Sequence, residues 1–132
     1  MPFYQFTVPA GGPSAQRKAE IAAAVTRVHT EATGAPARYV NCSFVEVPPG
    51  SIFVAGDAVE AGRMVGIIRR GRSEEVKRTL LRGLAEAWSS VTGEPVEGLA
   101  LFIHEVPGYQ AMEGGELLGE ASEDHAIAEA RG

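Results

Sequence analysis

The sequence has little cysteine, no long apolar run and no excess of basic residues. Cys42 is the one cysteine among 132 residues, which excludes an internal disulfide and a cysteine-ligated metal cluster and favours a reducing, cytoplasmic location. No segment reaches the apolar length that crosses a bilayer, and the N-terminus lacks a secretory signal pattern. The formal net charge of −5 argues against general nucleic-acid binding. We therefore expect neither a membrane nor a nucleic acid as a partner.

The residues that are present suffice for one domain over residues 1–132. Hydrophobic residues make up 45% of the chain, enough for a single core. Charge is unevenly distributed, because seven of the twelve basic residues lie between Arg63 and Arg82. From Glu105 onward the chain holds seven acids and only one basic residue, Arg131. The basic segment therefore stands out against an acidic background.

An internal repeat with an offset of 59 positions is the most informative feature. Three pairs of motifs share this offset. They are Ser14 with Ser73, Thr33-Gly34-Ala35-Pro36 with Thr92-Gly93-Glu94-Pro95, and Glu46-Val47-Pro48 with Glu105-Val106-Pro107. The repeat predicts a first copy at about residues 2–60, a second copy at about 61–115 and a C-terminal tail over 116–132.

Each copy is predicted to form a strand, a helix and a second strand. The strands are expected at residues 3–8, 39–47, 64–68 and 99–106. Apolar side chains at helical spacing lie between the strands of each copy. Ser14 and Ser73 are expected to cap the helix starts, and Gly34 and Gly93 to end the helices. Two right-handed crossovers then predict an α+β fold with a duplicated β-α-β unit: a four-stranded mixed sheet with both helices on one face.

Pro2 is the first candidate catalytic residue. Removal of Met1, which a small second residue permits, would leave a secondary amine on a rigid ring. An ordinary α-amino group titrates at about pH 7.7–8. Burial lowers that pKa and nearby carboxylates raise it, so the amine can serve as a base or an acid near neutral pH. Many unrelated proteins begin Met-Pro, so Pro2 alone indicates little.

A histidine and an arginine cluster add two further candidates. His29 lies beside the apolar stripe of the first helix, and its equivalent in the second copy is Trp88. A half-buried structural histidine with a backbone partner is as good an interpretation as a catalytic one. Arg69, Arg70 and Arg72 occupy a strand-to-helix junction, where ligands gather in sheets joined by crossovers. Guanidinium groups bind carboxylates as a fork, which favours a small-anion site over a solvated basic loop.

The tail contributes Glu113, which alone is one acid among many. From Gly108 onward we expect a short element over a sheet edge or a neighbouring subunit, with fraying from about Ala121. His104 and His125 have no partner at ligand spacing, so no metal site is expected. No glycine-rich phosphate-binding motif precedes a helix, and no cofactor is expected.

Four motifs in a fixed order carry a family resemblance. They are Met1-Pro2-Phe3-Tyr4, His29 in a His-x-x-x-Thr-Gly helix ending, Arg69-Arg70-Gly71-Arg72-Ser73, and Glu105-Val106-Pro107 with Glu113 six residues beyond the proline. The set resembles the tautomerase superfamily, whose members have a catalytic amino-terminal proline and a β-α-β building block. The closer likeness is to the long-chain group that includes cis-3-chloroacrylic acid dehalogenase, and it covers the chain up to about Gly115.

The resemblance implies a role for each matching residue. By this likeness Pro2 is the catalytic amine, and Tyr4 is the aromatic residue beside it. Arg69 and Arg72 bind the substrate carboxylate, and His29 helps to bind substrate. Glu113 activates water, as the equivalent acid does in the dehalogenases. It also implies a homotrimer around a central barrel, acting on a small carboxylate substrate.

The sequence departs from the dehalogenase pattern at Phe102. The dehalogenases carry a tyrosine in that substrate-binding strand position, and its hydroxyl assists water activation. Phenylalanine neither donates nor accepts a hydrogen bond there, which weakens the case for dehalogenation more than for tautomerisation. Tyr109 in the next loop is another possible source of a hydroxyl.

Three functions therefore stay open. The first is a tautomerase in which a neutral Pro2 shuttles a proton on 2-oxo acids such as phenylpyruvate. The second is a cis-3-haloacrylate hydratase-dehalogenase, in which a cationic Pro2 protonates carbon while Glu113 and His29 direct water. The third is a non-catalytic trimer that binds an anionic metabolite or a partner protein. The first two require opposite charge states of Pro2 at neutral pH.

Overall fold

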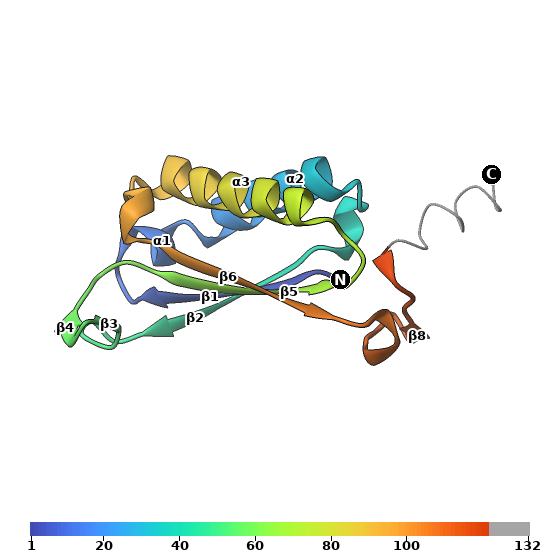
Figure 1. Cartoon of the computed structure of the whole chain (residues 1–132). Helices are drawn as coiled ribbons and strands as arrows, with labels where there is room; N and C mark the ends of the chain where they lie inside the picture. Colours follow the sequence, from blue (N-terminus) through green and yellow to red (C-terminus); the bar gives the residue numbers. More distant parts are fainter. Residues whose placement is uncertain (122–132) are drawn as a thin grey trace.

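A computed structural model describes residues 1–121, and its centre is a four-stranded mixed sheet. The strands are β1 (Phe3–Pro9), β2 (Asn41–Val47), β5 (Arg63–Arg69) and β6 (Ala100–Val106), in the spatial order β2-β1-β5-β6. β1 is parallel to β2 and antiparallel to β5, and β5 is parallel to β6. The long helices α2 (Lys18–Thr33) and α3 (Glu74–Thr92) cover one face (Figure 1). The predicted fold class is confirmed.

The core lies between this sheet and the two helices. Tyr4, Phe6 and Val8 alternate along β1 and are fully buried, because every second side chain of a strand points to the same face. Trp88 from α3 contacts the edge of the Phe6 ring, with centroids 5.2 Å apart. Ile21 from α2 also lies in this cluster. Each large side chain buried in this way contributes about 1.5–3 kcal/mol to stability.

Local signals at three helix ends act as predicted. Ser73 caps α3, because its hydroxyl oxygen accepts a hydrogen bond from the Val76 N–H at 3.2 Å. Gly34 and Gly93 follow α2 and α3 in the left-handed conformation, with φ of 77° and 79°. Glycine adopts this conformation without a steric penalty, and so both helices end there.

The predicted capping role of Ser14 is wrong. Ser14 lies inside a separate short helix, α1 (Pro13–Gln16), and α2 begins after Arg17 with no side-chain cap. The buried Ser14 hydroxyl donates to the Glu94 carboxylate and accepts from Trp88 Nε1 at 3.0 Å. Ser14 therefore does not cap a helix but links the first copy to Trp88 and Glu94 of the second copy by buried hydrogen bonds.

Two strands begin later than predicted. Short 3-10 turns, η1 (Ala37–Tyr39) and η2 (Val96–Gly98), occupy the residues that follow Pro36 and Pro95. The strands therefore start at Asn41 and Ala100 instead of residues 39 and 99. Both turns stand at equivalent places in the repeat, and they delay the strand start by two residues in the first copy and by one in the second.

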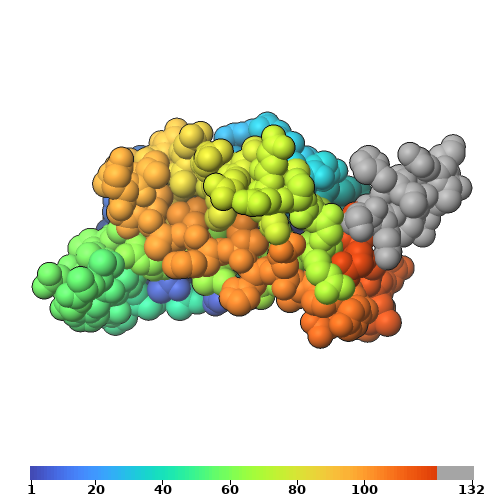
Figure 2. All heavy atoms as spheres, in the orientation of Figure 1, coloured from blue at the N-terminus to red at the C-terminus, as the bar shows by residue number. Residues whose placement is uncertain are grey.

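Two hairpins extend the repeat beyond the predicted motifs. β3 (Phe53–Val54) pairs with β4 (Asp57–Ala58), and 59 positions later β7 (Met112–Glu113) pairs with β8 (Glu116–Leu117). Each turn has two residues with positive φ, Ala55-Gly56 and Gly114-Gly115, as tight hairpins require. The hairpins project from opposite ends of the molecule (Figures 1 and 2).

Residues after 121, where fraying is predicted, lie outside the described part of the chain. Within residues 1–121, no helix is long and apolar enough to span a membrane.

Candidate active site

The strand directions bring the candidate residues to one end of the sheet. Because β1 is antiparallel to β5, Phe3 at the start of β1 pairs with Ile67 near the end of β5. Asn41, the first residue of β2, lies on the other side of Phe3. Arg69 at the end of β5 lies opposite Val106 at the end of β6. The N-terminus, the arginine junction and the β7–β8 hairpin therefore gather at this end (Figure 1).

The N-terminal residues are enclosed beside Glu113. Pro2 is fully buried, and the amino group of Met1 forms an ion pair with the Glu113 carboxylate. Burial and the nearby Arg69 lower the pKa of this amino group from about 8 to about 6. The Pro2 nitrogen is one residue from this amine, so a chain beginning at Pro2 would present its own amine next to the same groups.

Asn41 ties Glu113 to the N-terminal segment. Its backbone N–H donates to the Pro2 carbonyl at 3.0 Å. Its side-chain amide lies 3.3 Å from the same carbonyl and 3.4 Å from Glu113 Oε2. The sequence motifs do not mark Asn41, because its role depends on pairing between β1 and β2. Asn41 is therefore a site residue that sequence reasoning missed.

His29 and Tyr4 meet between α2 and the sheet. The Tyr4 hydroxyl lies 2.7 Å from His29 Nδ1, and the two rings meet edge to face. His29 is 1% exposed, so the expected half-buried histidine with a backbone partner is corrected to a buried one with a side-chain partner. Burial, Arg72 and the N-terminal amine lower the pKa of His29 to about 3, which keeps the ring neutral. Gly66, opposite Tyr4, leaves space for the phenol ring, since a Cβ there would lie 2.7 Å from it.

The arginine junction places two guanidinium groups near this pair. Gly71 has a φ of 123°, a left-handed conformation that turns the chain between β5 and α3. Arg69 and Arg72 are both half-buried. Arg69 acts electrostatically on the N-terminal amine, and Arg72 acts on both His29 and Tyr4. The two arginines therefore lie around the enclosed N-terminus.

The segment that follows β8, residues 118–121, is bound by hydrogen bonds and an ion pair to the arginine junction between β5 and α3. Arg70 forms an exposed ion pair with Glu120 at 3.0 Å, and Arg69 Nη1 donates to the Gly119 carbonyl at 2.8 Å. The Gly108 N–H donates to the Glu120 carboxylate at 2.9 Å. A Cβ on Gly108 would lie 1.9 Å from the Gly119 oxygen, so glycine is required for this close approach. Arg70 is exposed and pairs with Glu120, whereas the half-buried Arg69 and Arg72 are the arginines that act on the N-terminal amine and on His29.

Phe102 is not brought to this end of the site within one chain. It pairs with Val65, whereas its neighbours Leu101 and Ile103 pack against the core. Phe102 therefore lies on the open face of the sheet, opposite the helices, and is 58% exposed. Its substrate-binding role stays a prediction that requires a second subunit.

The equivalent end of the second copy does not carry these residue types. At an offset of 59 positions, His29 is replaced by the buried Trp88, whose ring would lie 2.4 Å from a Cβ on Gly62. The other equivalents of Pro2, Tyr4, Asn41, Arg69, Arg72 and Glu113 are Ala61, Arg63, Ala100, Ala10, Pro13 and Val54. The two copies thus carry one candidate site between them.

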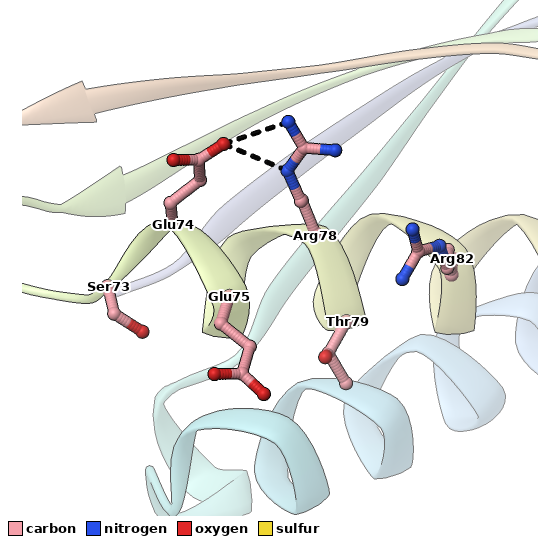
Figure 3. Close-up of a pocket in the computed structure, with 6 residues that line it drawn as sticks. All are labelled: Ser73, Glu74, Glu75, Arg78, Thr79 and Arg82. Carbon is pink, nitrogen blue, oxygen red and sulfur yellow. Dashed lines mark hydrogen bonds and ion pairs between the residues drawn. The ribbon is translucent and has the colours of Figure 1, made fainter.

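A surface hollow along α3 is separate from the candidate site. It is lined by Ser73, Glu74, Glu75, Arg78, Thr79 and Arg82 (Figure 3). Arg78 Nε donates to Glu74 at 3.0 Å, an ordinary pair one helical turn apart.

Within residues 1–121, no group of three histidine, cysteine or acidic side chains is placed to hold a metal ion.

The comparisons with known proteins show the family of this chain. A family model that describes oxalocrotonate tautomerase enzymes, Tautomerase_3, matches residues 1–114. The chain belongs to this tautomerase family. The match includes the N-terminus, both β-α-β units and Glu113. No curated protein sequence matches the chain.

Solved structures place this tautomerase-family chain among related folds. The crystal structure of N1, a member of the cis-3-chloroacrylic acid dehalogenase family, has a TM-score of 0.87 at 27% identity and covers 95% of this chain and 89% of its own. The F6 fused 4-OT wild-type asymmetric trimer has a TM-score of 0.79 at 25% identity, with coverages of 87% and 94%. Pt0534 inactivated by 2-oxo-3-pentynoate (TM-score 0.80, 21% identity, coverages of 88% and 94%) supports the fold alone.

Proposed function

We propose that this chain catalyses the enol–keto tautomerisation of small 2-oxo acids such as phenylpyruvate, with Pro2 as the base after Met1 is removed. The observation that carries the proposal is the enclosure of the N-terminus: Pro2 is fully buried, and burial and Arg69 lower the pKa of the Met1 amine that precedes it to about 6. An amine with this pKa is mostly neutral at neutral pH, as a base must be. The same surroundings support a neutral Pro2 in the processed chain.

Each charged group has a place in the proposed reaction. The Pro2 nitrogen accepts the proton of the enol hydroxyl and delivers a proton to C3, so that the C2–O bond becomes the carbonyl and no net proton is lost. Arg69 and Arg72 bind the carboxylate and stabilise the negative charge that develops on the enolate oxygen. His29 stays neutral and contributes hydrogen bonding, because its pKa of about 3 rules out an acidic imidazolium at neutral pH.

The base role predicts that activity falls on the acid side of the pH profile. The folded site lowers the amine pKa, so the neutral form persists to a lower pH than it would for an ordinary α-amino group. We expect kcat/KM to be level above about pH 7 and to fall by about tenfold per pH unit well below the amine pKa. Ketonisation of enol-phenylpyruvate from pH 4.5 to 9 measures this profile. Loss of activity above the amine pKa would contradict the base role.

The second candidate is hydration and dehalogenation of cis-3-haloacrylates. The Glu113 carboxylate beside the N-terminal amine favours this reading, since a carboxylate stabilises an ammonium and can direct water. The structural likeness to N1 of the dehalogenase family also favours it. A cationic Pro2 would then protonate C2 while Glu113 takes a proton from the water that attacks C3, and the resulting 3-halo-3-hydroxy acid would release halide and a proton to give the 3-oxo acid. Activity would be lost as the pH rises above the amine pKa. The lack of a hydroxyl on Phe102 counts against efficient dehalogenation.

We further propose that the chain assembles as a homotrimer through the open sheet face. Phe3, Val65 and Phe102 expose apolar side chains on this face, and the F6 fused 4-OT neighbour is a trimer.

Val65→Asp should weaken the trimer by more than about tenfold, because an unpaired carboxylate is costly to bury. Val96→Asp is a matched control, since Val96 in η2 is 43% exposed against 42% for Val65 and lies outside this face. Native mass spectrometry over a dilution series that finds both variants equally trimeric would contradict this interface.

A further inference from the structure

We infer that Tyr4 is a positioning residue that holds His29 in a single tautomer, with the proton on Nε2, so that His29 offers a neutral N–H donor to a substrate oxygen. This inference deepens the proposed function and rests on it for the identity of the substrate. It is carried by a buried hydrogen bond at Nδ1 and by a buried nitrogen, Nε2, that has no partner within residues 1–121.

The direction of the Tyr4–His29 hydrogen bond follows from burial. The Tyr4 side chain is fully buried, and within the described residues its hydroxyl has one hydrogen-bond partner, His29 Nδ1 at 2.7 Å. If Nδ1 donated to the phenol oxygen, the phenol proton would be buried without an acceptor. Leaving a buried donor unsatisfied is far less favourable than using it. Tyr4 therefore donates, and Nδ1 accepts.

The charge states of both groups agree with this direction. Burial raises the pKa of Tyr4, so the phenol keeps the proton that it donates. Burial first, and then the Arg72 guanidinium, keep His29 neutral by lowering its pKa, and the N-terminal amine acts in the same direction when it is protonated. A neutral imidazole carries one proton, and a ring whose Nδ1 accepts must carry it on Nε2.

Among residues 1–121, the Nε2–H group is therefore a donor without an acceptor. Buried polar groups are almost always hydrogen-bonded, and an exception calls for a functional explanation. Arg72, which is proposed to bind the substrate, acts on this ring electrostatically, and so does the Met1 amine, whose place the Pro2 amine takes in the processed chain. A carboxylate or enol oxygen is the acceptor that fits. A neutral donor also adds a hydrogen bond without adding a third positive charge beside Arg69 and Arg72.

Nitrogen-15 NMR of histidine-labelled protein reads the tautomer without any substrate. At neutral pH we expect His29 to show an unprotonated Nδ1 and a protonated Nε2, with His29→Gln assigning its signals among the three histidines. Tyr4→Phe keeps the ring and removes the donor, so the His29 signals should shift towards a mixture of tautomers. Tyr39→Phe removes a hydroxyl from a 41% exposed tyrosine and should leave them unchanged. A protonated Nδ1 in the wild-type protein would overturn the inference.

A double substitution tests whether Tyr4 acts through His29. Glutamine places an amide N–H near the position of Nε2 but has no tautomers. Tyr4→Phe should lower kcat/KM by about tenfold in the wild-type background and by less than about twofold in the His29→Gln background. Equal losses in both backgrounds would overturn the positioning role. If the NMR result holds but no 2-oxo acid is turned over, the tautomer assignment stands and the proposed function fails.

Discussion

Pro2→Ala should lower kcat for enol ketonisation by about 100-fold or more, because general base catalysis contributes about 10²–10⁴-fold. Alanine at position 2 still ends in an amine, but a primary one on a freely rotating chain. The rigid ring of Pro2, fully buried at the start of β1, sets the direction of the nitrogen lone pair. The measurement is steady-state kinetics on enol-phenylpyruvate with the variant confirmed by mass to begin at residue 2.

Two controls, one variant and one unprocessed chain, show whether the effect is specific to the Pro2 amine. Pro49→Ala replaces an exposed proline in the loop after β2 and should keep full activity. A chain that retains Met1 has an amide in place of the Pro2 amine, so it has no basic nitrogen on the ring and should be inactive. Full ketonisation activity in either Pro2→Ala or the Met1-retaining chain would contradict a catalytic Pro2 amine, and no ketonisation by the wild-type chain beginning at Pro2 would favour the non-catalytic anion-binding alternative.

Arg72→Ala should lower kcat/KM by about 100-fold, mainly by raising KM. Loss of one partner of a buried charge pair costs about 2–5 kcal/mol, and each 1.4 kcal/mol is about tenfold in rate. Arg72 is half-buried beside His29 and Tyr4, where screening by water is reduced. Arg72→Lys keeps the charge without the planar fork, so its loss should be intermediate.

A matched arginine separates local binding from net charge. Arg78 is an exposed residue of α3 in an i,i+4 pair with Glu74 (Figure 3). Arg78→Ala changes the net charge by the same amount and should alter kcat/KM by less than about twofold, because exposed pairs contribute little. Equal effects of the two substitutions on KM would show that Arg72 acts only through the overall charge.

The fold was largely predictable because its signals are local. Ser73, Gly34 and Gly93 act on the backbone next to them, so their roles follow from neighbouring residues. Ser14 shares the repeat offset with Ser73 but not its role, since Glu94 and Trp88 engage its hydroxyl from the other copy. An offset between copies thus predicts the placement of elements and not the partner of each side chain.

Parts of the candidate site depend on contacts that no local pattern contains. The bond between Tyr4 and His29 requires the packing of α2 on β1, and the contacts of Asn41 require the β1–β2 pairing. The hairpin had a readable signal, since Gly114-Gly115 between short polar and apolar segments indicates a tight turn. The direction of Phe102 had none, because residues 99–103 are all apolar and show no alternation.

Covalent labelling of the N-terminus tests the central claim most directly. Treatment with 2-oxo-3-pentynoate, an electrophilic 2-oxo acid, followed by intact-mass and peptide mapping, identifies the nucleophile that the site exposes. We expect a chain beginning at Pro2 to gain the mass of one inhibitor molecule on Pro2 as activity is lost, and a chain retaining Met1 to gain none on Pro2. A chain beginning at Pro2 that stays unlabelled, or that loses activity through a label on another residue such as Cys42, would contradict a catalytic Pro2 amine.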